Sequence, residues 1–497
     1  MPQCSKCIER GQDCLGYQRL LLWQDGVASR GKLVGQKYGA KQQPESRREP
    51  YAKSSSAQEW QRARVATVRN QLPLSRPLTD PLTQDLNDVT RSYLSYFASV
   101  VCRDFVVYDS EHNPFRDIIP LTHNHPILLQ IIIANAAIHM YNATQPFLIP
   151  GSSDDGQVFA SPRNKPGNLY SDALAAKQRA LTMLRQVLAQ QAPKDIDVTL
   201  AVVIMFINLE LMDAKAADWI HHINGGRKII EALGKSERLQ ITTASPLRRF
   251  LVSSWMISSA LGFVSSNAVH DLPDDVSSDN TERAVESLIR DAEGNHCSSF
   301  PTILLQLLRN GVRLSQSVSS ISLRNKRDRV LMLVCTAKTF DPRAWATDLR
   351  SPCPSPDLEE RIHVASAHKA AVIIYLSRLL VSMYTGSKPT CDFESLVTEI
   401  VENLSMVTDE NSLYTAITWP AFIAGAETNS TLHQRFVWTR LERQWELEPW
   451  GLYRKAADIL QTIWNAKNCI PAMDDDQIRD GDWVQYLRQR GIDWLIL

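Results

Sequence analysis

The sequence predicts an all-α protein: a large, irregular multi-helix body that follows a short cysteine-containing segment and a flexible basic linker. Three observations support this prediction. From about residue 81 onward, apolar residues recur at every third or fourth position, which is the spacing of one helix face. The strict apolar and polar alternation of half-buried strands does not occur in these segments. With 497 residues, 44% of them hydrophobic, the chain is also long enough to bury a large core.

The first three helices of the body are predicted from their apolar spacing. Residues 125–140 begin with Pro126, which the first turn of a helix tolerates, and are apolar nearly all round, so we expect this helix to be buried. The helix predicted over residues 85–105 has an apolar stripe of Leu86, Val89, Tyr93, Phe97, Val100 and Val101. The helix predicted over residues 168–191 should bury one face made of Leu174, Leu181, Leu184 and Leu188, with Lys and Arg opposite.

Two later helices are predicted with their start signals. Residues 195–211 open with two acidic residues, which suit the positive end of the helix dipole, and continue as a largely apolar, buried segment. Ser355 and Pro356 are suitable cap and first-turn residues for a long helix that ends near residue 384. Breaks rich in Pro, Ser, Asp and Gly predict surface loops near residues 145–167, 266–282 and 341–356, and the middle one leaves open a division into two lobes.

The cysteines at the start of the chain have the spacing of a metal site. Cys4, Cys7 and Cys14 form a C-x2-C-x6-C pattern, and a structural zinc ion prefers four such ligands in a tetrahedron. Three thiolates leave one position open. The alternative, that they are small core hydrophobes, is disfavoured by their polar surroundings. The other cysteines have no regular spacing, which predicts reduced thiols of an intracellular protein: Cys102, Cys297, Cys335, Cys353, Cys391 and Cys469.

The segment between the cysteines and the body is basic. Residues 1–80 carry about 14 Lys and Arg against about 7 Asp and Glu, although the whole chain has 54 of each kind. A basic arm of this kind suits contact with a polyanion such as DNA, and a solvated leader is the open alternative. Residues 18–80 are predicted to be largely disordered, and no heptad run follows the cysteines. No signal peptide or membrane span is predicted.

Two parts of the sequence together resemble one known family. Residues 2–17 and the phrase GVASRGK at residues 26–32 resemble the second repeat of the fungal binuclear zinc-cluster (Zn2Cys6) DNA-binding domain. Residues 81–497 resemble the fungal-specific transcription factor domain that follows such clusters. The best single motif is W-x-x-H-[IL]-x-G at Trp219, His222, Ile223 and Gly225.

The resemblance implies a nuclear transcription factor of RNA polymerase II genes, pathway-specific in the way of a metabolic gene-cluster regulator, with an all-helical regulatory domain over residues 81–497. It implies zinc as cofactor, with Cys4, Cys7 and Cys14 of residues 1–17 as ligands. The first repeat, which supplies the other cysteines and the DNA-reading helix, is absent from this sequence. We expect it to be encoded upstream; the alternative is a regulator that acts without DNA contact, as a homodimer or with a zinc-cluster partner. A small-molecule effector is left open.

No catalytic residues are predicted, because no G-x-S-x-G, H-E-x-x-H, G-x-G-x-x-G or Walker-type pattern occurs. One remote enzyme alternative is a helical terpene-synthase-like protein that binds Mg²⁺ through Asp475, Asp476 and Asp480. Histidine pairs are interpreted as structural. His123 and His125 should lie in a turn, His221 and His222 should point to different sides of a helix, Asn135 and His139 should form a buried polar pair, and His363 and His368 should lie on different faces.

Overall fold

A computed structural model describes residues 83–147, 167–189, 195–214, 218–234, 245–265, 287, 289, 290, 292–316, 322–349, 357–383, 391–468 and 482–497. This described part is 79% helical, which confirms the predicted all-α class. Its one β-type pairing is an isolated antiparallel bridge between Val106 and His296. The predicted boundaries at residues 17 and 80, and the break near 266–282, stay predictions.

The first predicted helix is present as three consecutive pieces. They are α3 (Asp88–Tyr96), the π-helical turn η2 (Phe97–Val101) and α4 (Cys102–Asp104). The side chain of Asn87 accepts a hydrogen bond from the Thr90 amide and so caps α3. The predicted stripe is only partly correct, since Val89 is 62% exposed, whereas Phe97 is fully buried. Val89 lies in the first turn, before the helix reaches the core.

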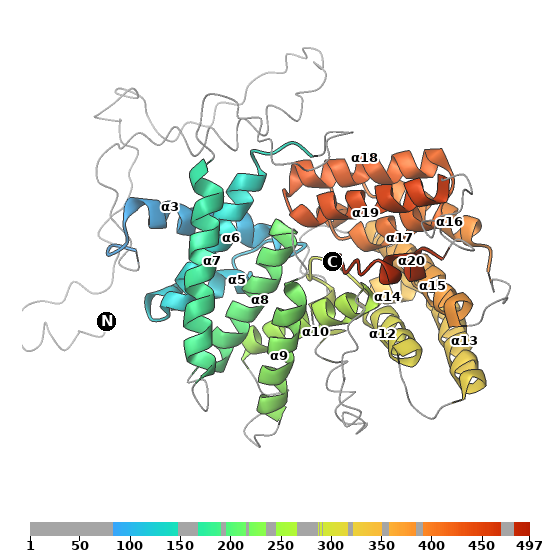
Figure 1. Cartoon of the computed structure of the whole chain (residues 1–497), viewed down its shortest axis with the longest axis horizontal. Helices are drawn as coiled ribbons and strands as arrows, with labels where there is room; N and C mark the ends of the chain where they lie inside the picture. The colour runs from blue at the N-terminus through green and yellow to red at the C-terminus, as the bar shows by residue number, and fades with distance from the viewer. Residues whose placement is uncertain are drawn as a thin grey trace, which may run out of the picture. The chain divides into compact units, whose positions relative to one another are not determined.

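A group of helices surrounds α6 and α8 in the first half of the body (Figure 1). Pro126 begins α6 as predicted, and the side chain of Asp195 caps α8 by accepting from the Val198 amide at 3.2 Å. Both helices are apolar nearly all round and are largely buried, as expected. The elements of this group are α5 (Pro114–Asp117), η3 (Pro120–His123), α6 (Pro126–Asn142), α7 (Gly167–Leu188), α8 (Ile196–Asp213), α9 (Trp219–Gly234) and α10 (Pro246–Ser265).

The buried face of α7 is not the predicted one. Leu184 is buried, but Leu174, Leu181 and Leu188 are 43%, 36% and 49% exposed. The face that packs against the body consists of small residues and Leu184, because the backbone of α7 lies close against α6. The buried side chains of this face are Ala173, Ala176, Ala180 and Leu184.

A second group of helices surrounds α15 (Leu358–Met383). One of them, α14 (Pro342–Asp348), corrects the prediction of a loop over residues 341–356. The Asp341 side chain accepts from the amides of Arg343 and Ala344, and Pro342 occupies the first helical position, so this polar sequence begins a helix. The other elements are α12 (Thr302–Gln316), α13 (Leu323–Thr339), α16 (Phe393–Ser405), η6 (Ser412–Tyr414), α17 (Thr418–Glu427), α18 (Thr431–Leu447), α19 (Gly451–Asn468) and α20 (Trp483–Gln489).

Helix α15 is long and apolar enough to cross a membrane by length and composition, and it is the one such helix in the described part of the chain. Most of its residues are buried by α12, α13, α14, α16 and α17. Its buried Arg361 and Arg378 are paired with Asp357 and Glu427. These neighbours identify α15 as the core helix of its group. Its predicted start signals, Ser355 and Pro356, lie outside the described residues.

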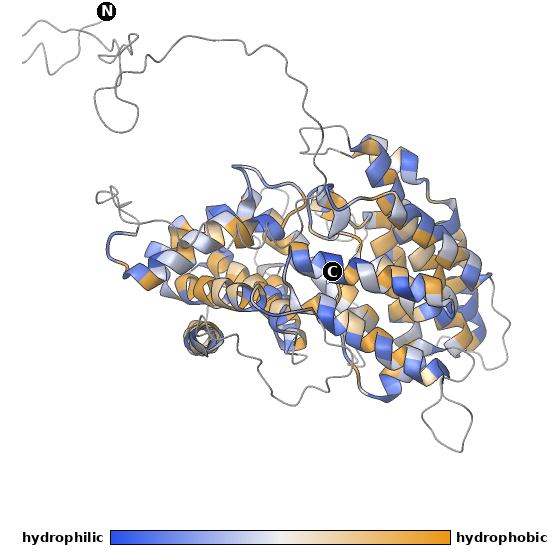
Figure 2. Cartoon of the chain, turned by 90° about the horizontal axis from the view of Figure 1, so that it is seen from above, coloured by the Kyte–Doolittle hydropathy of each residue, from blue (hydrophilic) through white to orange (hydrophobic). Residues whose placement is uncertain are grey.

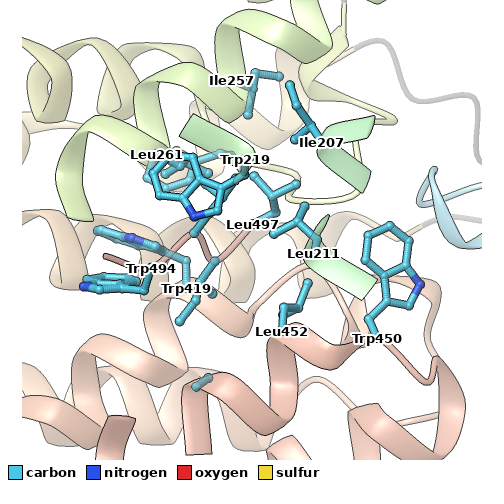
Figure 3. Packing of buried hydrophobic residues seen from close by; sticks show 14 of the residues in the cluster. Ile207, Leu211, Trp219, Ile257, Leu261, Trp419, Trp450, Leu452, Trp494 and Leu497 are labelled. Carbon is cyan, nitrogen blue, oxygen red and sulfur yellow. The ribbon is translucent and has the colours of Figure 1, made fainter. Parts of the chain in front are cut away.

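The two groups share one apolar core. Gly451, at the start of α19, approaches the backbone carbonyl of Met212 at the end of α8 so closely that a Cβ would overlap it. Asn142 joins the same segments, since its Nδ2 donates to the Met212 carbonyl at 2.8 Å and to the Pro449 carbonyl at 3.0 Å. Figure 3 shows this core, in which Trp494 and Leu497 of the C-terminal segment lie among side chains from both groups. Apolar residues mark the inward faces of the helices (Figure 2).

Candidate functional site

The residues predicted to bind zinc, Cys4, Cys7 and Cys14, lie outside the described part of the chain, so the zinc site stays a prediction. The aspartates considered as Mg²⁺ ligands, Asp475, Asp476 and Asp480, also lie outside the described residues. Among the residues that the structure describes, no cluster of three or more His, Cys, Asp or Glu side chains could hold a metal ion. The described cysteines, Cys102, Cys297, Cys335 and Cys391, are free thiols, as predicted for them.

The first two histidine pairs are placed structurally. His123 is exposed in the turn before α6, and His125 Nε2 lies 3.6 Å from the Asp195 carboxylate. His221 is exposed on α9, while the neighbouring His222 faces inward, as expected. These positions agree with the structural interpretation of both pairs.

The other two pairs also have separate partners. Asn135 and His139 are both buried but do not pair with each other, which corrects the expected pair. Asn135 donates to the Ile131 and Met205 carbonyls, whereas His139 lies 2.9 Å from both the Asp104 carboxylate and the Tyr96 hydroxyl. His363 contacts the Asn403 amide oxygen at 2.9 Å. His368 packs against Phe300 and Trp419, so it faces a different side of α15.

The W-x-x-H motif positions α9 against α8 and α10. Trp219 is 4% exposed, and a Cβ on Gly262 of α10 would lie 2.6 Å from its ring, so the two helices approach closely at this point. Farther along α9, the ring of Trp255 from α10 lies directly beside Gly226, and a Cβ added to Gly226 would overlap this ring. By contrast, Gly225, the glycine of the predicted motif, adjoins open space, and a Cβ added there would meet no atom within 4 Å. The glycine that packing requires is therefore Gly226.

His222 of the motif completes a buried charge cluster. Its Nε2 lies 3.4 Å from the Glu210 carboxylate of α8, and Lys177 of α7 reaches the same oxygen at 2.7 Å. The His222 ring also stacks on Phe206, with 4.8 Å between the ring centroids. Burial by itself would raise the pKa of Glu210, but the hydrogen bonds and charges of His222 and Lys177 outweigh burial and lower it. The cluster therefore holds an ionised carboxylate between three helices.

A second buried charge cluster joins α15, α17, α19 and α20. Arg378 donates from Nε to the Glu427 carboxylate at 2.9 Å, and the indole nitrogen of Trp483 donates to the same oxygen at 3.0 Å. Lys467 donates to the last carbonyls of α17, including those of Ala426 at 2.8 Å and Glu427 at 2.7 Å. Burial lowers the pKa of Lys467 to about 8. These contacts fix helices that are distant in sequence.

Burial also raises the pKa values of a carboxyl group, Glu448, and a thiol, Cys297. Burial raises the pKa of Glu448 well above its ordinary range, and the charge of Asp104 raises it further. Tyr453 donates to the Glu448 carboxyl at 3.2 Å. Burial also raises the pKa of the Cys297 thiol to about 12, so this thiol stays protonated and is a poor nucleophile. The described interior thus stabilises the fold and has no activated nucleophile among these groups.

Comparison with known proteins identifies the family of this helical body. The family model described as the fungal-specific transcription factor domain matches residues 92–497. The chain belongs to this family. Its all-α body is thus a fungal-specific transcription factor domain, and the protein is a transcriptional regulator.

A curated relative supports the same assignment. The chain is 29% identical, over 425 residues, to the acriflavine sensitivity control protein acr-2 of Neurospora crassa. The alignment covers 83% of this chain and 68% of the relative. No solved structure matches the chain.

Sequence reasoning found the motif on α9 but missed its structural partners. Glu210 and Lys177 lie in segments whose helical character was predicted, yet nothing in their local sequence shows that they meet His222. A weak signal was available for Glu210. It is an acidic residue within an otherwise apolar segment, and such a residue is buried only with a partner.

Proposed function

We propose that this protein controls transcription of RNA polymerase II genes in the nucleus, and that it does so without enzymatic activity. The observation that supports this proposal is the match of the fungal-specific transcription factor domain to residues 92–497, together with an all-helical body. The test is the transcriptome of a strain that lacks the gene, combined with imaging of the tagged protein. We expect nuclear signal and a restricted set of changed transcripts; a cytosolic protein whose loss changes no transcript would contradict the proposal.

DNA contact is proposed to depend on zinc bound by Cys4, Cys7 and Cys14. Three thiolates leave a tetrahedral site incomplete, so we expect the 497-residue chain to bind less than one equivalent of zinc tightly and to show no sequence-selective DNA binding. Mapping the 5′ end of the transcript tests for an upstream repeat. If the chain is produced with a C-x2-C-x6-C repeat in frame, we expect two zinc ions and selective binding, and Cys7→Ser should abolish both. Nanomolar sequence-specific binding by the chain alone would contradict this account.

The alternative is regulation through protein contacts only. In this account a chain without a complete zinc cluster dimerises with an intact zinc-cluster factor and withholds it from DNA. Affinity purification of the tagged protein from its own cells distinguishes the two accounts. Recovery of a zinc-cluster factor, with no enrichment of DNA sites in chromatin immunoprecipitation, supports the alternative. Enrichment of defined promoter sites that is lost in Cys7→Ser supports direct DNA contact.

The controlled genes are proposed to include determinants of sensitivity to toxic compounds. The support is the name of the relative, which states control of acriflavine sensitivity. Growth of the deletion strain across an acriflavine concentration series tests this directly. A changed inhibitory concentration, restored by the intact gene, is the expected result, and unchanged growth in every concentration would contradict it.

A further inference from the structure

Helix α7 carries a regular row of exposed leucines. Leu174, Leu181 and Leu188 are spaced by seven residues and are 43%, 36% and 49% exposed. Exposed polar residues alternate with them along the same face, namely Ser171, Gln178 and Arg185. Together these six residues occupy the two inner positions of a heptad repeat over nearly the whole helix, and we call them the leucine face.

Helix α7, which carries the leucine face, is fixed in place by contacts with the rest of the body. Behind it, Ala173, Ala176 and Ala180 are buried against the body. At the flanks, Lys177 binds Glu210 at 2.7 Å and Arg179 donates to the Gln130 amide oxygen at 2.6 Å. These contacts fix the rotation of α7, so the three leucines cannot turn inward without breaking the charge cluster. Their exposure is a property of the packed helix, and a row of apolar side chains on a rigid helix favours association.

We propose that the leucine face binds the same face of a second copy of this chain, with the two α7 helices antiparallel. The seven-residue spacing is the reason for choosing a second copy. A heptad row is complementary to itself under a two-fold axis, whereas any other partner would need its own matching row.

The charges on the face determine the orientation. In a parallel pair, Arg185 would lie directly opposite Arg185 of the second copy, which places two like charges at an apolar contact. An antiparallel pair with its two-fold axis between Gln178 and Leu181 places Arg185 beside Leu174 of the second copy instead. The two arginines are then about 16 Å apart along the helix axis, and each can cover a leucine with its aliphatic stem. Leu174 and Leu181 each lie between two leucines of the other helix, and Leu188 lies beside Leu174 of the other helix at the end of the contact.

The strength of this contact should be modest. A typical coiled-coil seam has two apolar residues in each heptad, and the leucine face has one. We therefore expect reversible association of the purified chain, with a dissociation constant in the micromolar range. The proposal goes beyond the regulatory function and is tested on purified protein, so its failure would leave that function untouched.

Sedimentation equilibrium of the full chain tests the surface. Leu174→Glu combined with Leu181→Glu should weaken the dimer by about 100-fold or more, since it places charges at an apolar contact. The matched control is Leu432→Glu, which changes a leucine that is 77% exposed on α18 and should leave the dimer intact. Circular dichroism and the melting temperature should be the same for all variants. A monomer at every concentration, or a dimer unaffected by the double substitution, would overturn the proposal.

Disulfide crosslinking tests the orientation. A protein with Leu174→Cys and a second protein with Arg185→Cys should form a mixed crosslinked dimer when combined, because these positions face each other in the antiparallel pair. Neither protein alone should crosslink through the new cysteine, since about 16 Å separates the like positions and a disulfide needs Cα atoms within about 7 Å. The unsubstituted chain gives the background from Cys335, which is exposed. Rapid crosslinking of Arg185→Cys with itself would refute the antiparallel arrangement.

Discussion

The indole ring of Trp255 on α10 occupies the space beside Gly226 on α9. Its nitrogen also donates to the carbonyl of Ile223, at 3.0 Å, so the ring is held from two sides. Two adjacent glycines in one helix thus have different environments, because Gly225 has open space around its α-carbon. The contact between α9 and α10 depends on the second glycine.

Gly226→Ala should lower the free energy of unfolding by about 1–3 kcal/mol, the usual cost of forcing an extra group into a packed contact. Gly225→Ala is the matched control, and it should be neutral or stabilise by up to about 1 kcal/mol, since alanine is the better helix former. Urea denaturation of both variants measures the difference. Equal changes in the free energy of unfolding for the two substitutions would show that packing against Trp255 is not the cause of the destabilisation.

The ion pair of Arg378 and Glu427 leads to a second prediction. Both residues are 6% exposed, so removing the arginine leaves a buried carboxylate with Trp483 as its remaining side-chain donor in the described contacts. Arg378→Met should therefore destabilise the protein by about 3–5 kcal/mol. Adding Glu427→Gln should recover part of this loss, because the uncompensated charge is removed. Strictly additive losses in the double variant, measured by urea denaturation, would contradict the coupling.

Glu448 should make the protein less stable as the pH rises. Its pKa in the folded state is raised, by burial first and by Asp104 second, so the folded state holds a proton that the unfolded chain releases near its ordinary value of 4.5. Stability from this group is present at low pH and declines as the pH rises from about 4.5 toward the raised pKa. Glu448→Gln should thus increase the free energy of unfolding more at pH 8 than at pH 5.

Melting temperatures across this pH range test the prediction for Glu448. Glu442→Gln, at an exposed position on the preceding helix α18, controls for the loss of one negative charge. If Glu448→Gln changed stability by the same amount at pH 5 and pH 8, the carboxyl would not be the group responsible.

The stability that His296 contributes should have the opposite pH dependence to that of Glu448, because it should decrease as the pH falls. Burial lowers its pKa from 6.5 to about 4, so the unfolded chain binds a proton before the folded state does. Its contribution to stability is present above pH 6.5 and is lost as the pH falls toward 4, with a slope of about 1.4 kcal/mol per pH unit. His296→Asn keeps an acceptor for the Ser298 amide and does not titrate, so denaturation between pH 4 and 6.5 should show a shallower slope. An unchanged slope would rule out this histidine.

The sequence was sufficient for the fold class because helices such as α6 and α8 are apolar over their whole length and begin with clear signals at Pro126 and Asp195. It did not determine which face of α7 is buried. Leucine is the more hydrophobic residue, but the small side chains of Ala173, Ala176 and Ala180 allow the backbone of α7 to approach α6. Such a choice depends on the neighbouring helix, which local spacing does not reveal.

In the candidate site, too, the sequence predicts single residues but not the contacts between helices. Trp219 and His222 were selected from their pattern, and both are inward-facing residues of α9. The charged partners of His222 come from α7 and α8, which lie earlier in the chain, and no local feature predicts those contacts. The open Gly225 and the crowded Gly226 are also indistinguishable in sequence, because only the position of Trp255 separates them.

The C-terminal segment affects how the body forms in the cell. Trp494, Leu495, Ile496 and Leu497 are 4%, 6%, 1% and 7% exposed, and Figure 3 shows Trp494 and Leu497 within the core shared by the two helix groups. The ribosome adds these four residues after every helix that the structure describes. The shared core therefore cannot close completely during translation of α3 to α20, and the apolar side chains that these four residues cover stay exposed until the four residues have been synthesised. Closure of the core is thus a late step, which follows the synthesis of all the helices that the structure describes.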